Sequence, residues 1–114
     1  TFNPVTLNGI KLLMSLCRKY PAVPVIFGHM GGSNWMDVIA FAKEHGQAYL
    51  DLSAAFTPLS VRTALTEVPE KCLFGSDAPF GEPHLCRQLI EFVSPSFSVT
   101  ELALGGNIER LLQI

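Results

Sequence analysis

The chain has 114 residues, enough for one domain or a piece of one. Its hydrophobic fraction of 48% and mean hydropathy of +0.32 are high for that length, and only 16% of its residues are charged. A small domain has much surface to cover, so we expect some of the apolar side chains to meet a surface outside this chain. The net charge of -2 and the lack of any basic run argue against a nucleic-acid partner.

The sequence contains neither a membrane segment nor a secretion signal. Every apolar run is interrupted well before the ~20 residues that span a bilayer. The start, TFNPVTLNG, lacks the basic and apolar regions of a signal peptide, so the cytoplasm is the default location. Because the sequence begins with Thr1 instead of Met, we expect the true N-terminus to lie upstream. The cysteines match no zinc-binding spacing and are expected to be buried free thiols in a reducing compartment.

Helices and short apolar strands alternate along the chain. Apolar residues at helical spacing predict helices over residues 5–20, 34–45, 58–68, 83–93 and 99–104, with a last helical turn from Asn107. Short apolar segments predict three strands, VPVIFGH over 23–29, AYLDLS over 48–53 and KCLFGSD over 71–77. Strands of this composition are expected to be buried on both faces.

Strands separated by helices predict parallel βαβ units, because a parallel pair needs a long crossover connection. Three parallel strands alone leave two open edges and bury little surface. The fold class is therefore α/β, and the sheet is expected to be part of a larger one, either a doubly wound sheet or a (β/α)₈ barrel. A complete barrel takes ~250 residues, and this chain has fewer than half of them.

Ionisable side chains close two of the three predicted strands. His29 ends the first strand and Asp77 ends the third, while the middle one ends in Ser53 after Asp51. In α/β barrels the catalytic residues lie at this carboxyl end of the strands. Imidazole nitrogen and carboxylate oxygen are ordinary Zn²⁺ ligands, and a divalent ion lowers the pKa of its water so that a nearby aspartate can take the proton. The structural alternatives are a histidine bonded to a backbone carbonyl and an aspartate that begins a turn.

The sequence resembles the amidohydrolase-related family in four segments that occur in the right order: VIFGHMGG, YLDLS, LFGSDAPF and GGNIERLL. The resemblance covers nearly the whole chain. It implies a (β/α)₈ TIM barrel whose strands six to eight, with their flanking helices, lie in this chain. It also implies that His29 is the sixth-strand histidine, which holds a second metal or acts on the substrate. Asp77 is by resemblance the eighth-strand aspartate, which binds the metal and handles the water proton, and Asn107 caps the closing helix.

The same resemblance implies metal ligands that this chain does not carry. The family takes two ligands from its first strand, commonly a His-x-His pair, and another histidine from its fifth strand, but no histidine precedes His29. Residues 1–114 are therefore expected to form a partial barrel domain without its N-terminal half. With His29 and Asp77 alone, the expected divalent metal, Zn²⁺ as the first choice, should bind weakly to this chain by itself.

Several functions remain open. The leading hypothesis for the whole protein is a metal-dependent hydrolase acting on a C–N or C–O bond of a small molecule, and a non-oxidative decarboxylase of the same family is the alternative. A hypothesis of another class is an inactive, truncated barrel remnant. A doubly wound nucleotide-binding domain is weaker, because no GxGxxG or GxxxxGK follows a strand. The expected partner is a small-molecule substrate, with neither nucleic acid nor membrane, and a homo-oligomer is left open.

The remaining histidines and several other residues receive structural interpretations. His45 falls at a helix C-terminus, where partial positive charge is favourable, and His84 is expected to be exposed. Trp35 and Phe41 lie on an apolar helical stripe and are expected in the core. Ser53 has no neighbouring base in the sequence and no nucleophile elbow around it, so a Ser-His-Asp hydrolase is not expected.

Overall fold

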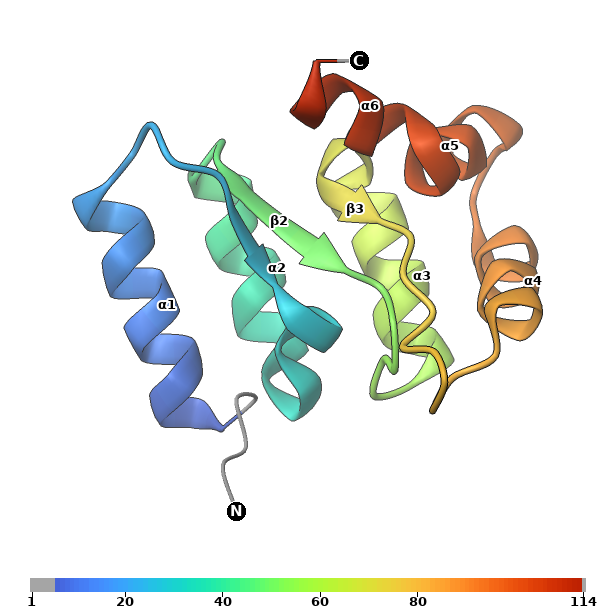
Figure 1. Ribbon diagram of the computed structural model, residues 1–114, viewed down its shortest axis with the longest axis horizontal. Coiled ribbons are helices and arrows are strands. Elements are labelled where there is room, and N and C mark those ends of the chain that lie inside the picture. The colour runs from blue at the N-terminus through green and yellow to red at the C-terminus, as the bar shows by residue number, and fades with distance from the viewer. Residues whose placement is uncertain (1–5, 114) are drawn as a thin grey trace.

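The computed structural model describes residues 6–113 as a small parallel sheet with helices packed against one of its faces (Figure 1). The sheet has the order β1-β2-β3, and its strands are β1 (Val25–Phe27), β2 (Ala48–Asp51) and β3 (Cys72–Leu73). Each neighbouring pair is parallel. The predicted α/β fold with parallel strands is confirmed.

Helices precede, separate and follow the strands. They are α1 (Leu7–Lys19), α2 (Trp35–Glu44), α3 (Pro58–Glu67), α4 (Pro83–Val93), α5 (Phe97–Glu101) and α6 (Asn107–Leu112). The first four match predicted helices, apart from Val5, which lies outside the described residues. Residues 99–104 are helical and α6 begins at Asn107, as predicted, but the helix starts two residues earlier, at Phe97, and a π-helical turn, Leu102–Gly106, joins α5 to α6 without a break. Within residues 6–113 none of the helices is long and apolar enough to cross a membrane.

Hydroxyl side chains cap the first turns of three helices, α1, α3 and α5. Thr6 and Ser96 accept hydrogen bonds from first-turn backbone N–H groups of α1 and α5. Thr57 and Ser60 form a reciprocal capping box at the start of α3. Asn34 occupies the N-cap position of α2, but its side chain makes no capping hydrogen bond.

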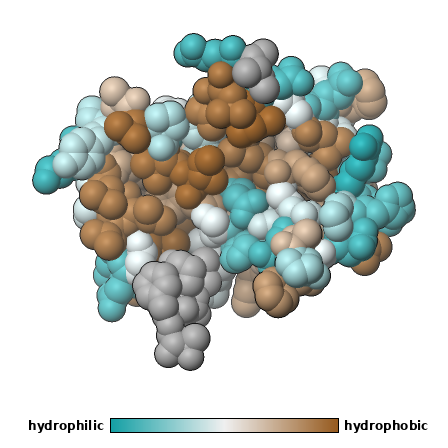
Figure 2. Space-filling model, in the orientation of Figure 1, coloured by the Kyte–Doolittle hydropathy of each residue, from teal (hydrophilic) through white to brown (hydrophobic). Residues whose placement is uncertain are grey.

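β1 and β2 are buried mainly on one face, whereas both residues of β3 are buried. Phe27, Leu50 and Cys72 are paired across the sheet and are all 0% exposed, because the helices cover their side. Ile26, on the opposite face of β1, is 45% exposed, and its partner Tyr49 is half-buried. The prediction of burial on both faces is therefore wrong for β1 and β2 and holds for β3, where Cys72 and Leu73 are both buried. Figure 2 shows apolar side chains gathered on the uncovered face over α1 and the strands, as expected for apolar residues that meet a surface outside the chain.

Two of the strands are much shorter than predicted. β1 stops at Phe27 because His29 to Gly32 all have positive φ, which is incompatible with a strand. β3 stops at Leu73 because the next residue turns to a different partner. The N–H of Phe74 donates to the carbonyl of Ala103 in the π-helical turn at 2.9 Å.

The cysteines are all free, but they differ in burial. Cys72 is 0% exposed, and burial, which would desolvate the thiolate, together with the nearby charge of Glu70 raises its pKa to about 12. Burial also raises the pKa of the Cys17 thiol. Both residues confirm the expectation of buried free thiols, whereas Cys86 is only half-buried.

Asn107 joins the last helix to the third strand. It is 0% exposed, and its Nδ2 donates to the carbonyls of Pro69 at 2.7 Å and Cys72 at 2.8 Å. Its expected role as a helix cap is wrong. The π-helical turn runs straight into α6, with Gly106 in a helical conformation, so the first turn of α6 has no free N–H groups to cap.

We expect Asn107→Ala to lower the free energy of unfolding by about 2–4 kcal/mol, because two buried carbonyls lose their donor. Urea denaturation measures the change. Asn34→Ala is the matched control, since the Asn34 side chain makes no capping hydrogen bond, and it should stay within about 0.5 kcal/mol of the wild type. Equal effects of the two substitutions would contradict this role for Asn107.

Candidate functional site

Unusual backbone conformations gather where the three strands end. His29 and Met30 after β1, Ala54 after β2 and Asp77 after β3 all have positive φ, between 45° and 56°. Residues other than glycine pay about 1–2 kcal/mol for this left-handed conformation. Strain of this kind is typical of functional sites, where the surrounding structure holds it in place.

The turn after β1 is packed tightly against α2. Met30 is 0% exposed, and Gly31 is also buried, at a φ of 82°. A Cβ on Gly31 would lie 2.6 Å from Cγ2 of Val38, so only glycine fits both the conformation and the space. The sequence HMGG thus places His29 at the start of a rigid left-handed turn.

The Asp51 carboxylate, at the end of β2, accepts three hydrogen bonds. Its Oδ2 accepts from the backbone N–H of His29 at 3.0 Å and from the hydroxyl of Ser53 at 2.5 Å. Its Oδ1 accepts from the backbone N–H of Ser53 at 3.1 Å. Gly75 packs against the same carboxylate, because a Cβ there would lie 2.2 Å from Oδ1. One side chain therefore links the segments that follow all three strands.

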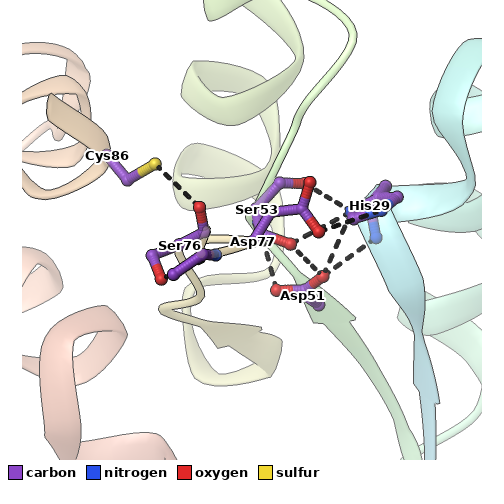
Figure 3. Close-up of polar contacts among 7 residues, drawn as sticks. His29, Asp51, Ser53, Ser76, Asp77 and Cys86 are labelled. Carbon is purple, nitrogen blue, oxygen red and sulfur yellow. Dashed lines mark hydrogen bonds and ion pairs between the residues drawn. The ribbon is translucent and has the colours of Figure 1, made fainter. Parts of the chain in front are cut away.

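The imidazole of His29 is held at one edge by Ser53. Its Nδ1 lies 3.0 Å from both the carbonyl oxygen and the hydroxyl oxygen of Ser53, and 3.6 Å from Oδ2 of Asp51. The other ring nitrogen, Nε2, lies 3.8 Å from Oδ1 of Asp77. Figure 3 shows that these four side chains converge, whereas Ser76 and Cys86 lie to one side.

A tight turn presents Asp77. The N–H of Gly81 donates to the carbonyl of Asp77 at 2.8 Å, and the peptide bond between Ala78 and Pro79 is cis. A Cβ on Gly81 would lie 1.9 Å from the carbonyl oxygen of Ser76, so the turn needs glycine at this position. The Asp77 side chain is 35% exposed and the His29 side chain 33%, so both remain accessible.

The pair formed by His29 and Asp77 fits a divalent ion as part of a ligand set. Two atoms that each lie about 2.0–2.2 Å from one Zn²⁺ are at most about 4.4 Å apart, and Nε2 and Oδ1 are 3.8 Å apart. A stable site needs at least one more protein ligand. Within residues 6–113 no group of three or more His, Cys, Asp or Glu side chains is arranged to hold a metal.

The structure brings the two predicted site residues together and adds two that the sequence analysis missed. Ser53 was expected to have no neighbouring base, which is wrong, because His29 contacts it. Ser53 is nevertheless no nucleophile here, since it is 4% exposed and its hydroxyl donates to Asp51. The signal for Asp51 was its position two residues before Ser53, since an aspartate commonly accepts the N–H two residues on.

The other predicted side-chain environments are mostly confirmed. His45 ends α2, where its Nδ1 lies 3.0 Å from the carbonyl of Phe41 and its ring stacks on the Phe41 ring at 3.9 Å. His84 is exposed at the start of α4. Phe41 is buried, and Trp35 is half-buried against the core.

Comparison with known proteins places the chain in a family. The amidohydrolase family matches residues 5–114, nearly the whole sequence. The chain belongs to the amidohydrolase family, as its resemblance had predicted. No curated protein matches it.

Two solved structures share its fold. One is a dihydroxybenzoic acid decarboxylase from Polaromonas sp. JS666 with bound manganese and the inhibitor 2-nitroresorcinol, at 24% identity and a TM-score of 0.71. The other is a 2,6-dihydroxybenzoate decarboxylase complexed with 2,6-dihydroxybenzoate, at 20% identity and a TM-score of 0.71. The match covers 91% of this chain in both cases, but only 38% and 39% of those chains. At these identities the likeness establishes a common fold.

We expect Gly75→Ala to displace the Asp51 carboxylate, because the new Cβ would overlap Oδ1. The free energy of unfolding should fall by about 1–3 kcal/mol. The backbone amide signals of His29 and Ser53, which donate to that carboxylate, should shift in a two-dimensional NMR spectrum. Gly46→Ala is the control, since the nearest atom to its Cβ would be 3.9 Å away. Unchanged amide signals in Gly75→Ala would contradict the close packing of Gly75 on Asp51.

Proposed function

We propose that this chain supplies strands six to eight of a (β/α)₈ barrel enzyme. The parallel order β1-β2-β3, with helices on one face only, supports this placement. Three of eight βα units make up about three eighths of a barrel, and the chain covers 38% and 39% of the two decarboxylases. The uncovered face of the sheet would then point into the barrel, and residues 1–114 would be a partial domain.

The observation that carries the proposed chemistry is the approach of His29 to Asp77. Their accessible Nε2 and Oδ1 atoms face each other 3.8 Å apart at the carboxyl ends of β1 and β3. His29 and Asp77 would hold a divalent ion together with ligands from the rest of the barrel. When bound, such an ion polarises a carbonyl or carboxylate of the substrate. Asp77 would take up or deliver the proton that the reaction moves, and His29 would contact the substrate or the ion.

Decarboxylation of a small aromatic acid is the reaction we place first. The two structures with the same fold are decarboxylases of dihydroxybenzoic acids, and one of them binds manganese. Loss of CO₂ leaves a carbanion that must gain a proton. Asp77 in its protonated form would donate that proton and would regain one from water afterwards. Hydrolysis of a C–N or C–O bond is the second candidate, since the matching family is described as amidohydrolases. There Asp77 would accept a proton from water.

In the natural protein at full length, Asp77→Asn is expected to lower kcat for 2,6-dihydroxybenzoate decarboxylation by about 10²–10⁴-fold, because the proton-transfer group is lost. Elemental analysis should also find less bound divalent metal in this variant. His84→Gln is the control, since His84 is exposed at the start of α4 and should leave both readouts unchanged.

Each other outcome has a definite meaning. An Asp77→Asn variant with wild-type turnover and metal content contradicts the proposal. Turnover of amides or esters instead of the benzoate selects the hydrolase. A wild-type protein without metal and without either activity selects the inactive remnant. Zinc as the ion, a homo-oligomer as the assembly and the cytoplasm as the location stay predictions.

A further inference from the structure

The hydrogen bonds around Asp51 decide which atoms of Ser53 and His29 carry protons. A carboxylate only accepts hydrogen bonds. The Ser53 hydroxyl oxygen lies 2.5 Å from Oδ2 of Asp51, within the range of a charge-assisted O–H···O⁻ bond of about 2.5–2.7 Å. The single hydroxyl proton of Ser53 is therefore directed at Asp51 and is not available to His29.

Ser53 then faces His29 with acceptors only. Its backbone carbonyl cannot donate, and its hydroxyl proton is already engaged with Asp51. Both oxygens lie 3.0 Å from Nδ1 of His29. If Nδ1 carried a lone pair, it would face two acceptors at hydrogen-bond distance, which is repulsive. Nδ1 must therefore carry a proton, which it shares between the two oxygens (Figure 3).

We propose that Asp51 and Ser53 are positioning residues that hold the neutral His29 imidazole in its Nδ1–H tautomer, with the lone pair of Nε2 directed toward Asp77. The tautomer of a histidine is set by the hydrogen bond of its other ring nitrogen, and ligand histidines commonly donate to a carbonyl or carboxylate in this way. Ser53 contacts the ring at Nδ1, and Asp51 is bonded to Ser53 and to the backbone N–H of His29.

The arrangement makes the gap between His29 and Asp77 receptive to a cation or a proton donor. Nε2 and the Asp77 carboxylate are both acceptors in this state, and at 3.8 Å they are too far apart to share a direct hydrogen bond. A group with positive charge or acidic hydrogens would satisfy both. This consequence rests on the proposed function, whereas the tautomer itself does not.

Burial protects the positioning contacts from competing water. Ser53 is 4% exposed, and the Asp51 side chain is 23% exposed. The His29 N–H donates to the same Asp51 oxygen that receives the Ser53 hydroxyl, so the backbone and the ring of His29 are fixed by one network.

The test is a long-range ¹H–¹⁵N NMR spectrum of the histidine rings in the metal-free natural protein at full length. It is recorded at about pH 9, above the reference histidine pKa of about 6.5, where the ring nitrogens report the neutral tautomer. The signals of His29 and His45 are assigned by substituting each residue in turn. We expect His29 to be mainly Nδ1–H. His45 is an internal reference, because its Nδ1 contacts a carbonyl outside this network.

Asp51→Ala should lower the ratio of Nδ1–H to Nε2–H at His29 by about 3- to 10-fold, the equivalent of one net hydrogen bond. Without the carboxylate, the hydroxyl proton of Ser53 is free to turn toward Nδ1. Asp51→Ala combined with Ser53→Ala should restore the ratio, because the competing hydroxyl is gone while the Ser53 carbonyl remains. A purely structural role for Asp51 predicts no such rescue.

Matched controls separate this effect from general damage. Ser60 is also buried (0% exposed), and its hydroxyl donates to a carbonyl at the start of α3, so Ser60→Ala removes a comparable hydroxyl elsewhere. Asp37→Asn removes an exposed carboxylate from α2. Neither should change the His29 ratio. If a variant does not fold, the wild-type spectrum and the spectrum of Ser53→Ala still test the proposal. In both proteins His29 should be mainly Nδ1–H.

Two results would overturn the proposal: a wild-type His29 that is mainly Nε2–H, or an unchanged ratio in a folded Asp51→Ala. The measurement uses neither metal nor substrate. An Nδ1–H tautomer in a full-length protein that lacks metal and activity would contradict the proposed function alone. A metal-loaded, active protein with the opposite tautomer would contradict the positioning roles alone.

Discussion

The Asp51 carboxylate ties the ends of the strands together, and the geometry of the site depends on it. It accepts hydrogen bonds from His29 and Ser53, and Gly75 packs directly on it. A left-handed residue such as His29 costs about 1–2 kcal/mol, whereas a hydrogen bond to a charged group contributes about 1.5–3 kcal/mol. The bond from the His29 N–H to Asp51 is therefore strong enough to hold the backbone conformation that presents the imidazole.

The sequence predicted the order of helices and strands because that order depends on local patterns. Helical periodicity placed α1 to α4 within a few residues. The strand lengths were wrong because they depend on contacts distant in sequence. Phe74 leaves the sheet to donate to Ala103, nearly thirty residues later, and no local pattern encodes that choice. Asn107 was misassigned for the same reason, since its partners precede it by 35 and 38 residues.

Two of the four residues of the candidate site could be predicted from the sequence. His29 and Asp77 could be found because an ionisable residue that ends an apolar strand must face the carboxyl edge of the sheet. Asp51 and Ser53 were missed because they act through hydrogen bonds to His29, which follows a different strand. The apolar pattern of their own strand gives no sign of those hydrogen bonds. The left-handed conformation of His29 and Met30 was also hidden, since neither residue type favours it without tertiary contacts.

These contacts indicate which features of the proposed metal site this chain would supply and which the rest of the barrel would supply. The orientation of His29 and Asp77 is determined within this chain, by a hydrogen-bond network and by turns that only glycine fits. The number of metal ligands is not determined within this chain, because residues 6–113 bring no third metal-binding side chain to the pair. Side chains already held in place lose little freedom when an ion or a substrate arrives, so more of the interaction energy appears as affinity. In the proposed barrel, the paired His29 and Asp77 would raise the affinity for the ion. By themselves they would bind it weakly, since fixed geometry cannot replace absent ligands.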